Sequence, residues 1–335
     1  MAIKNKRLKF LRGSTYTFDV SDSTLGTNPL KFTADSGATE YTSGITLTGT
    51  QGQSGASLEF VVPLDAPNNL NYYGGDVGNI DDGSTTIADY TYDTVTFDTG
   101  TANPNNMHWK PDGTKVYILT QASAGEVLEI NLSTPWDLST ATDSGSPWSG
   151  FISQASLGGY GLHASTDGTK FYIMNFDNDV IYQYNLSTAW DISTASYANK
   201  SYDFGSGGYN TFEFNPTGTK IYVHDGTDDV IETHTLSTAW DISTASYDGA
   251  SSDFDHTVGT SMTTTLGITF SPDGTSFFVM AYQPTSIQGD IYQWDLTTPY
   301  DLSTASLTNN TLNVHNEDGD PVDIQFSIDG TKLYM

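Results

Sequence analysis

Cysteine is absent from the 335 residues, which excludes disulfides, thiolate metal sites and cysteine nucleophiles. No apolar run approaches the ~18–20 residues that a membrane-spanning helix needs, so we expect no membrane span. Met1 to Arg12 contain no apolar stretch of signal-peptide length, which disfavours export by that route. Helical periodicity is nearly absent, and short alternating runs lie between turn-forming residues. The chain is therefore predicted to be all-β.

Basic residues are scarce: 12 Lys and Arg stand against 40 Asp and Glu, a net charge of −28. Five of the 12 lie between Lys4 and Arg12, where there is no acidic residue, so the rest of the chain carries 7 against 40, a net −33. Such a surface repels phosphate backbones, and we expect no nucleic-acid partner. The basic segment is either a first strand with solvated lysines or a docking segment for an acidic partner.

Internal repeats begin near residue 90 and are the most informative feature of the chain. One anchor is an Asp-Gly-Thr turn whose five aligned positions are Asp112, Asp167, Thr217, Asp273 and Asp329, at steps of 55, 50, 56 and 56 residues. A second anchor, of the form Leu-Ser-Thr-x-Trp-Asp-Ile-Ser-Thr-Ala, follows the first four turns and carries Trp136, Trp190, Trp240 and Tyr300. A residue that recurs once per repeat usually packs, so we expect these rings in equivalent, largely buried sites. An aromatic binding platform is the alternative.

Each unit of ~50 residues divides into four strands, which is the signature of a β-propeller blade. In the second unit we expect strands at 161–164, 170–175, 180–186 and 200–204. Apolar residues alternate along the first strand of every unit and should pack blade against blade. They are Met107 and Trp109, Leu162 and Ala164, Phe212 and Phe214, Ile268 and Phe270, and Ile324 and Phe326.

The predicted blades are 103–153, 158–205, 208–257, 264–315 and a partial one at 320–335. Thr94–Asp98 is predicted to be the strand that closes the ring. The last blade still lacks strands, so either the chain is a piece of a longer one or another chain completes it.

Residues 1–88 do not repeat, and we predict a separate β-sandwich there, followed by the propeller at 89–335. The strand candidates are Thr15–Val20, Leu30–Ala34, Ile45–Gly49, Leu58–Pro63 and Leu70–Tyr73.

The repeats resemble those of lactonase-like propellers, whose blades carry a Ser-Pro-Asp-Gly-Thr-Lys-Leu-Tyr turn. The best matches are Phe270–Thr275 and Phe326–Tyr334. The resemblance covers about residues 94–335 and implies a fold, not an activity.

The N-terminal part resembles the cupredoxin-like domain of structural proteins from marine bacteriophages, including cyanophages. The matching stretches include Gly13–Ser23, Asn28–Phe32, Glu40–Gly44 and Phe60–Pro63, within roughly residues 8–80. The resemblance places the copper ligands of related domains at Asn28, Gly74, Val77 and Ile80. None of these is an imidazole or sulfur donor, so it implies a sandwich without a redox centre.

Two groups of residues are candidates for metal chemistry. His108, His163 and Glu213 occupy one first-strand position in successive units, so they are expected to converge near the propeller axis, where they are weak candidates for a metal site. Thr269 and Gln325 take that position in the other units, which favours packing. Acidic turns at 177–179, 225–229 and 317–320 resemble loose Ca²⁺ loops, but hairpin turns explain them as well.

No phosphate-binding loop, nucleophile elbow or zinc-protease motif occurs, so we expect no catalytic residues and no cofactor. Together with the resemblances, this predicts a phage virion protein of the tail or capsid, synthesised in the host cytoplasm. It would dock on other virion proteins in an oligomeric assembly, and its propeller would bind a host-surface glycan or protein. An extracellular lactonase- or lyase-like, metal-dependent enzyme and a bacterial cell-surface adhesin are the alternatives.

Overall fold

The structure, a computed structural model, describes residues 14–26, 29–33, 40–63, 71–74, 87, 90, 92, 95–98, 104–120, 125–151, 154, 159–257, 264–283, 288–314, 321–328, 330 and 332–335. The named elements are β-strands and short 3₁₀ turns. The chain divides into two compact units, Met1–Ser84 and Thr85–Met335, close to the boundary expected at 88/89. Within the described residues, no helix is long and apolar enough to cross a membrane.

The first unit contains two small antiparallel sheets around one core. One has the order β1 (Thr15–Asp19), β4 (Ser57–Val61), β3 (Ile45–Thr48), and the other pairs β2 (Leu30–Thr33) with β5 (Asn71–Gly74); η1 (Ser23–Gly26) follows β1. Leu58 and Phe60 alternate inward along β4, and the ring of Phe32 lies 5.4 Å from that of Phe60. All five predicted strands are confirmed to within two residues at each end. Lys4–Arg12 and the positions Asn28, Val77 and Ile80 lie outside the described residues.

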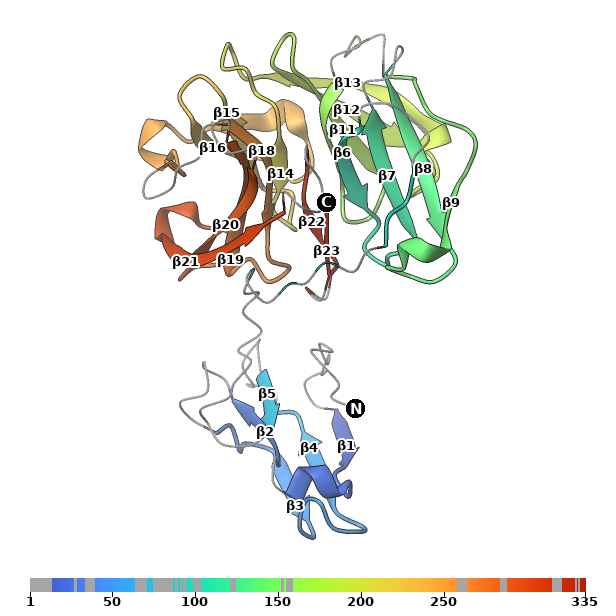
Figure 1. Ribbon diagram of the computed structural model, residues 1–335, viewed down its shortest axis with the longest axis vertical. Helices are drawn as coiled ribbons and strands as arrows, with labels where there is room; N and C mark the ends of the chain where they lie inside the picture. The colour runs from blue at the N-terminus through green and yellow to red at the C-terminus, as the bar shows by residue number, and fades with distance from the viewer. Residues whose placement is uncertain are drawn as a thin grey trace. The chain divides into compact units, whose positions relative to one another are not determined.

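The second unit is a β-propeller. Its described residues form four antiparallel sheets of four strands, each in sequence order, and one pair of strands, arranged around a common centre (Figure 1). The first blade contains β6 (Pro104–Trp109), β7 (Lys115–Thr120), β8 (Glu126–Leu132) and β9 (Ala141–Asp143), and the second contains β10 (Gly159–Ala164), β11 (Lys170–Asn175), β12 (Val180–Leu186) and β13 (Ala195–Asp203). The third blade contains β14 (Phe212–Phe214), β15 (Lys220–Asp225), β16 (Val230–Leu236) and β17 (Ala245–Tyr247), and the fourth contains β18 (Thr264–Phe270), β19 (Ser276–Gln283), β20 (Gln288–Leu296) and β21 (Ala305–Asn313). The described strands of the fifth blade are β22 (Gln325–Phe326) and β23 (Leu333–Tyr334).

The first strands of the five blades form a closed ring. β6 contacts β10, β10 contacts β14, β14 contacts β18, β18 contacts β22, and β22 returns to β6. The alternating apolar residues of these strands lie in the cores between blades, as predicted. The strands that the fifth blade lacks in the sequence therefore leave no break in the inner ring of first strands.

The predicted closing strand is wrong in its secondary structure. Of Thr94–Asp98, residues 95–98 are described and belong to no strand. Phe97 instead packs in the core shared by the fifth and first blades, with Trp109 and Tyr334. The fourth strand of the second blade also begins earlier than predicted, at Ala195, because it follows the Trp-containing segment directly and absorbs a bulge opposite Gln183 and Tyr184.

The segment between the third and fourth strands of each complete blade, here called the excursion, has one conformation. Its Asp caps a 3₁₀ turn by accepting from a Ser N–H two residues later. These turns are η3 (Leu138–Thr140), η4 (Ile192–Thr194), η5 (Ile242–Thr244) and η7 (Leu302–Thr304), and a further turn, η6 (Ala250–Ser252), follows β17.

The aromatic residue of each excursion has a left-handed backbone, with φ between 59° and 63°. Its N–H donates to the carbonyl of the glycine in the Asp-Gly turn, and its ring covers that glycine. A Cβ on Gly168 would lie 2.2 Å from the ring of Trp190, and Gly113, Gly218 and Gly274 are equally tight. Only glycine fits, so the two sequence anchors are two halves of one packing unit.

Candidate functional site: the axial recess

A recess of about 160 Å³ lies on the propeller axis at the end where the Asp-Gly turns cluster. Two sets of side chains line it. The inner ring comes from one position of the five first strands: His108, His163, Glu213, Thr269 and Gln325. The aromatic wall comes from the four excursions: Trp136, Trp190, Trp240 and Tyr300.

The structure brings the three weak metal candidates of the sequence side by side. The imidazole rings of His108 and His163 have centroids 4.4 Å apart, and Nε2 of His163 lies 3.3 Å from Oε1 of Glu213. Gln325 follows on the other side, with Nε2 3.5 Å from Nδ1 of His108. Within the described residues, however, no group of three or more His, Asp or Glu side chains is arranged to hold a metal ion.

The inner ring is polar, and burial favours the neutral form of each of its titratable groups. Burial lowers the pKa of His163 to about 3 and holds the pKa of His108 well below its usual value. Burial also raises the pKa of Glu213 to about 8, although 19% of its side chain is exposed. At the contact between His163 and Glu213, burial therefore favours a hydrogen bond between neutral groups over an ion pair. Together with Thr269 and Gln325, the ring offers donors and acceptors without a net charge.

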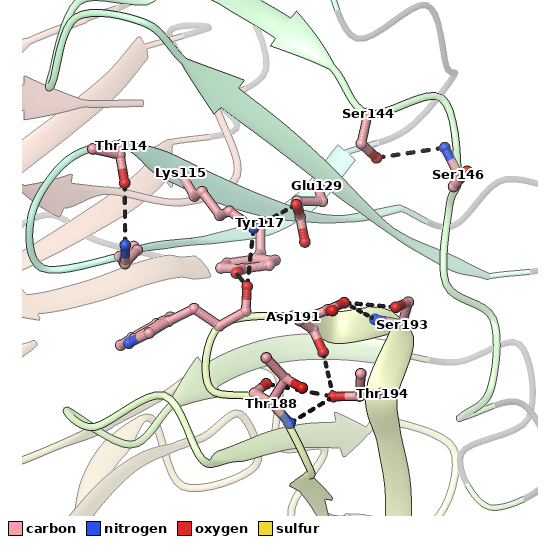
Figure 2. Close-up of polar contacts among 12 residues, drawn as sticks. Thr114, Lys115, Tyr117, Glu129, Ser144, Ser146, Thr188, Asp191, Ser193 and Thr194 are labelled. Carbon is pink, nitrogen blue, oxygen red and sulfur yellow. Dashed lines mark hydrogen bonds and ion pairs between the residues drawn. The ribbon is translucent and has the colours of Figure 1, made fainter.

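Tyrosines of the neighbouring blades hold the aromatic wall in place. Tyr117 donates to the carbonyl of Trp190 at 2.6 Å, in the arrangement that Figure 2 shows beside the Asp191 cap. The same bond recurs from Tyr172 to Trp240, from Tyr222 to Tyr300 and from Tyr334 to Trp136. Burial raises the pKa of Tyr117, Tyr172 and Tyr222, so these hydroxyls remain donors. We call this contact the tyrosine latch.

The wall residues are half-buried, because one face of each ring packs on its glycine while the ring also lines the recess. The prediction of equivalent packed sites is confirmed, and the packing and platform interpretations are not exclusive. The tyrosine latch was missed, although its signal is present: Tyr117, Tyr172, Tyr222 and Tyr334 each stand five residues after the aligned turn position.

Two of the three acidic turns are described, and their carboxylates accept hydrogen bonds from backbone N–H groups. Asp179 accepts from the N–H of Tyr209 at 3.0 Å, and Asp225 accepts from the N–H of Thr227 at 2.7 Å. The contact of Asp225 is the hairpin role that was weighed against Ca²⁺ binding, whereas the contact of Asp179 reaches a residue 30 positions later in the sequence. The third acidic turn, 317–320, lies outside the described residues.

No protein-family model and no curated protein matches the chain. Solved structures that are similar include a functionally unknown protein from Desulfotomaculum acetoxidans (14% identity, TM-score 0.40, 69% of this chain and 62% of that one). A second is the Cps50 (Swd1) β-propeller domain of Myceliophteria thermophila, with 12% identity and a TM-score of 0.39 over 66% of this chain and 63% of that one. A third is the periplasmic gluconolactonase of Pseudomonas aeruginosa, with 13% identity and a TM-score of 0.38 over 62% of this chain and 69% of that one. The chain spans less than two thirds of the first two. Identities this low concern the fold alone.

Proposed function

We propose that the propeller is a binding module that takes a neutral carbohydrate, one sugar residue at a time, in the axial recess. The observation that carries this proposal is the combination of an aromatic wall with an uncharged polar inner ring. Aromatic faces pack against the C–H faces of a sugar ring, and neutral donors and acceptors match its hydroxyls. The volume of about 160 Å³ is below the ~300–1,000 Å³ of pockets that enclose drug-sized ligands, which suits a single residue of a chain.

The setting that we propose for this module is a bacteriophage particle. The resemblance of residues 8–80 to virion structural proteins supports it, and so does the separation of the chain into two compact units. The first unit would join the chain to other virion proteins, and the propeller would meet a host-surface glycan. A cell-surface adhesin would use the same recess, and finding the chain in purified particles by mass spectrometry separates the two settings.

Intrinsic fluorescence tests binding, because four of the six tryptophans line the recess: Trp109 and the three tryptophans of the aromatic wall. We expect at least one member of a panel of methyl glycosides to change the emission saturably. Thr269→Val and Glu213→Leu should each weaken that binding about 5–10-fold, since each removes a polar group of the inner ring. Thr142→Val, at an exposed threonine of β9, is the matched control and should leave it unchanged. The proposal fails if no glycoside binds, or if the control weakens binding as much.

A sugar-lactone hydrolase is the second candidate, favoured by the Glu213–His163 pair. A carboxyl with a raised pKa beside an imidazole is suited to proton transfer. Turnover of glucono-δ-lactone that Glu213→Gln abolishes would support the enzyme. Sugar binding without turnover supports the binding module.

A further inference from the structure

A second recess, of about 280 Å³, lies at the opposite end of the third blade, before β14 begins and where β15 turns into β16. Its lining includes Phe176, Gly207, Asn210, His224 and Asp229. Neither the repeats nor the axial recess explains the chemistry of this pocket, and a ligand bound here would be independent of the proposed sugar site.

The hydrogen-bond network fixes the tautomer of His224. Asn210 donates from Nδ2 to the carbonyl of Thr265 at 3.1 Å, so its Oδ1 faces Nδ1 of His224 at 2.9 Å. Nδ1 must therefore carry the proton of this contact. Burial lowers the pKa of His224 to about 3, so the ring is neutral and Nε2 holds a lone pair.

That lone pair has no hydrogen-bond partner among the described residues, although His224 is only 2% exposed. Buried acceptors in proteins are almost always satisfied. The missing partner must be a donor, because a neutral Nε2 can only accept. A ligand that brings an N–H or O–H group would satisfy this acceptor.

The surroundings of the pocket are negative. Asp179, Asp225 and Glu232 are each more than nine-tenths buried close behind Gly207, and in the described part of the chain no lysine or arginine pairs with any of them. Asp229 adds an exposed carboxylate at the rim, and the ring of Phe176 is 38% exposed beside it. Carboxylates and an aromatic face both attract a cation.

We propose that this pocket binds a primary ammonium group, which donates one N–H to Nε2 of His224 while its positive charge lies between Asp229 and Phe176. A metal ion fits less well, because no group of three ligating side chains is assembled among the described residues. The ammonium comes either from a small amine or from a lysine side chain of another protein.

Isothermal titration with three probes of similar size separates charge from hydrogen bonding. We expect n-butylammonium to bind with one-to-one stoichiometry. Butyltrimethylammonium, which has the charge but no N–H, should bind at least 10-fold more weakly, and butan-1-ol should not bind measurably. A lysine-containing tripeptide forms the fourth arm: its binding together with n-butylammonium supports a protein lysine, and binding of n-butylammonium alone supports a small amine.

Two further measurements keep the proposal falsifiable without disturbing the buried imidazole. Asp229→Asn should weaken n-butylammonium binding about 5–10-fold, whereas Asp228→Asn, an equal change of charge outside the pocket lining, should change it less than 2-fold. The ¹⁵N resonance of His224 Nε2 should move upfield on binding, as it does when this atom accepts a hydrogen bond. Equal binding of the primary and quaternary amines, equal effects of the two variants, or an unmoved resonance in the complex would each overturn it.

Discussion

In the first four blades, an aromatic ring from the blade's own excursion covers the glycine of the turn, whereas in the fifth blade the ring of Tyr90, from ahead of the first blade, packs on Phe326 of the first strand. Trp240 lies 5.2 Å from Phe214, and Tyr300 lies 5.1 Å from Phe270. Tyr90 lies 5.7 Å from Phe326, which holds the equivalent position, and its hydroxyl donates to the carbonyl of Gly330. The glycine carbonyl of the fifth turn thus accepts from a side-chain hydroxyl 240 residues away in sequence, and not from the backbone N–H of an excursion.

Ile87, like Tyr90, makes a contact that an excursion residue makes in another blade. In the third blade, the N–H of Ile242 donates to Oε1 of Gln183 in the blade before it, at 3.1 Å. Ile87 makes the same bond to Gln293 of the fourth blade, at 2.9 Å, and both isoleucines are fully buried. Ile87, Tyr90 and Phe97 thus contribute contacts around the fifth blade. An interface between blades requires certain side-chain contacts, and the side chains that make them need not belong to the same repeat.

Removing the covering ring tests this equivalence and should have the largest effect. Trp240→Ala should cost about 3 kcal/mol of unfolding free energy, because it leaves a cavity over Gly218. Tyr90→Ala should cost about 2 kcal/mol if Tyr90 does the same work in the fifth blade. Urea denaturation measures both changes.

Tyr92 provides the control for Tyr90, since it stands two residues later and is 49% exposed. Tyr92→Ala should stay within about 0.5 kcal/mol of the parent protein. If Tyr90→Ala is no more costly than Tyr92→Ala, the fifth blade is not stabilised by this segment, and the comparison breaks down.

The same contrast explains what the sequence could predict. The blades follow from local signals, the Asp-Gly turn and the Trp-Asp segment, and β11 and β12 begin and end where the pattern places them. The placement of His108, His163 and Glu213 follows from their common repeat position. Tyr90 and Ile87 belong to no repeat, so their contacts with Gly330 and Gln293 depend on ring closure, which no local pattern encodes. The neutrality of the inner ring depends on burial, which the sequence does not give either.

A second contrast concerns two side-chain hydrogen bonds that join the first strands of neighbouring blades, here called clamps. Asn106 of the first blade accepts from the N–H of Leu162 at 2.9 Å, and Asp323 of the fifth blade accepts from the N–H of Met107 at 2.9 Å. The carboxyl of Asp323 is buried, and burial raises its pKa well above the usual value. A raised pKa in the folded state contributes stability that is complete below the unfolded pKa, near 4, and is lost as the pH rises through the folded pKa.

We therefore expect Asp323→Asn to stabilise the protein by about 1–2 kcal/mol at pH 7 and to remove part of the loss of stability between pH 4 and 7. Urea midpoints measured across this range give the difference between variant and parent. The mirror variant Asn106→Asp should introduce a similar loss at the other clamp. A less stable Asp323→Asn protein at pH 7 would mean that Asp323 is ionised and that its charge strengthens the clamp.

The smallest expected effect concerns the tyrosine latch, which the fourth blade lacks because Phe278 holds the equivalent position. Tyr172→Phe removes a 2.7 Å hydrogen bond to the carbonyl of Trp240 and should cost about 1 kcal/mol. Tyr117→Phe should cost about half as much, since Lys115 also donates to the carbonyl of Trp190, at 3.1 Å, and keeps it satisfied. Tyr160→Phe is the control, because no hydrogen bond links its hydroxyl to the described residues, and it should change the urea midpoint very little. Equal costs for Tyr172→Phe and Tyr160→Phe would show that the ring alone holds the blades together, as Phe278 does in the fourth blade, and that the hydroxyl serves only to orient the wall of the recess.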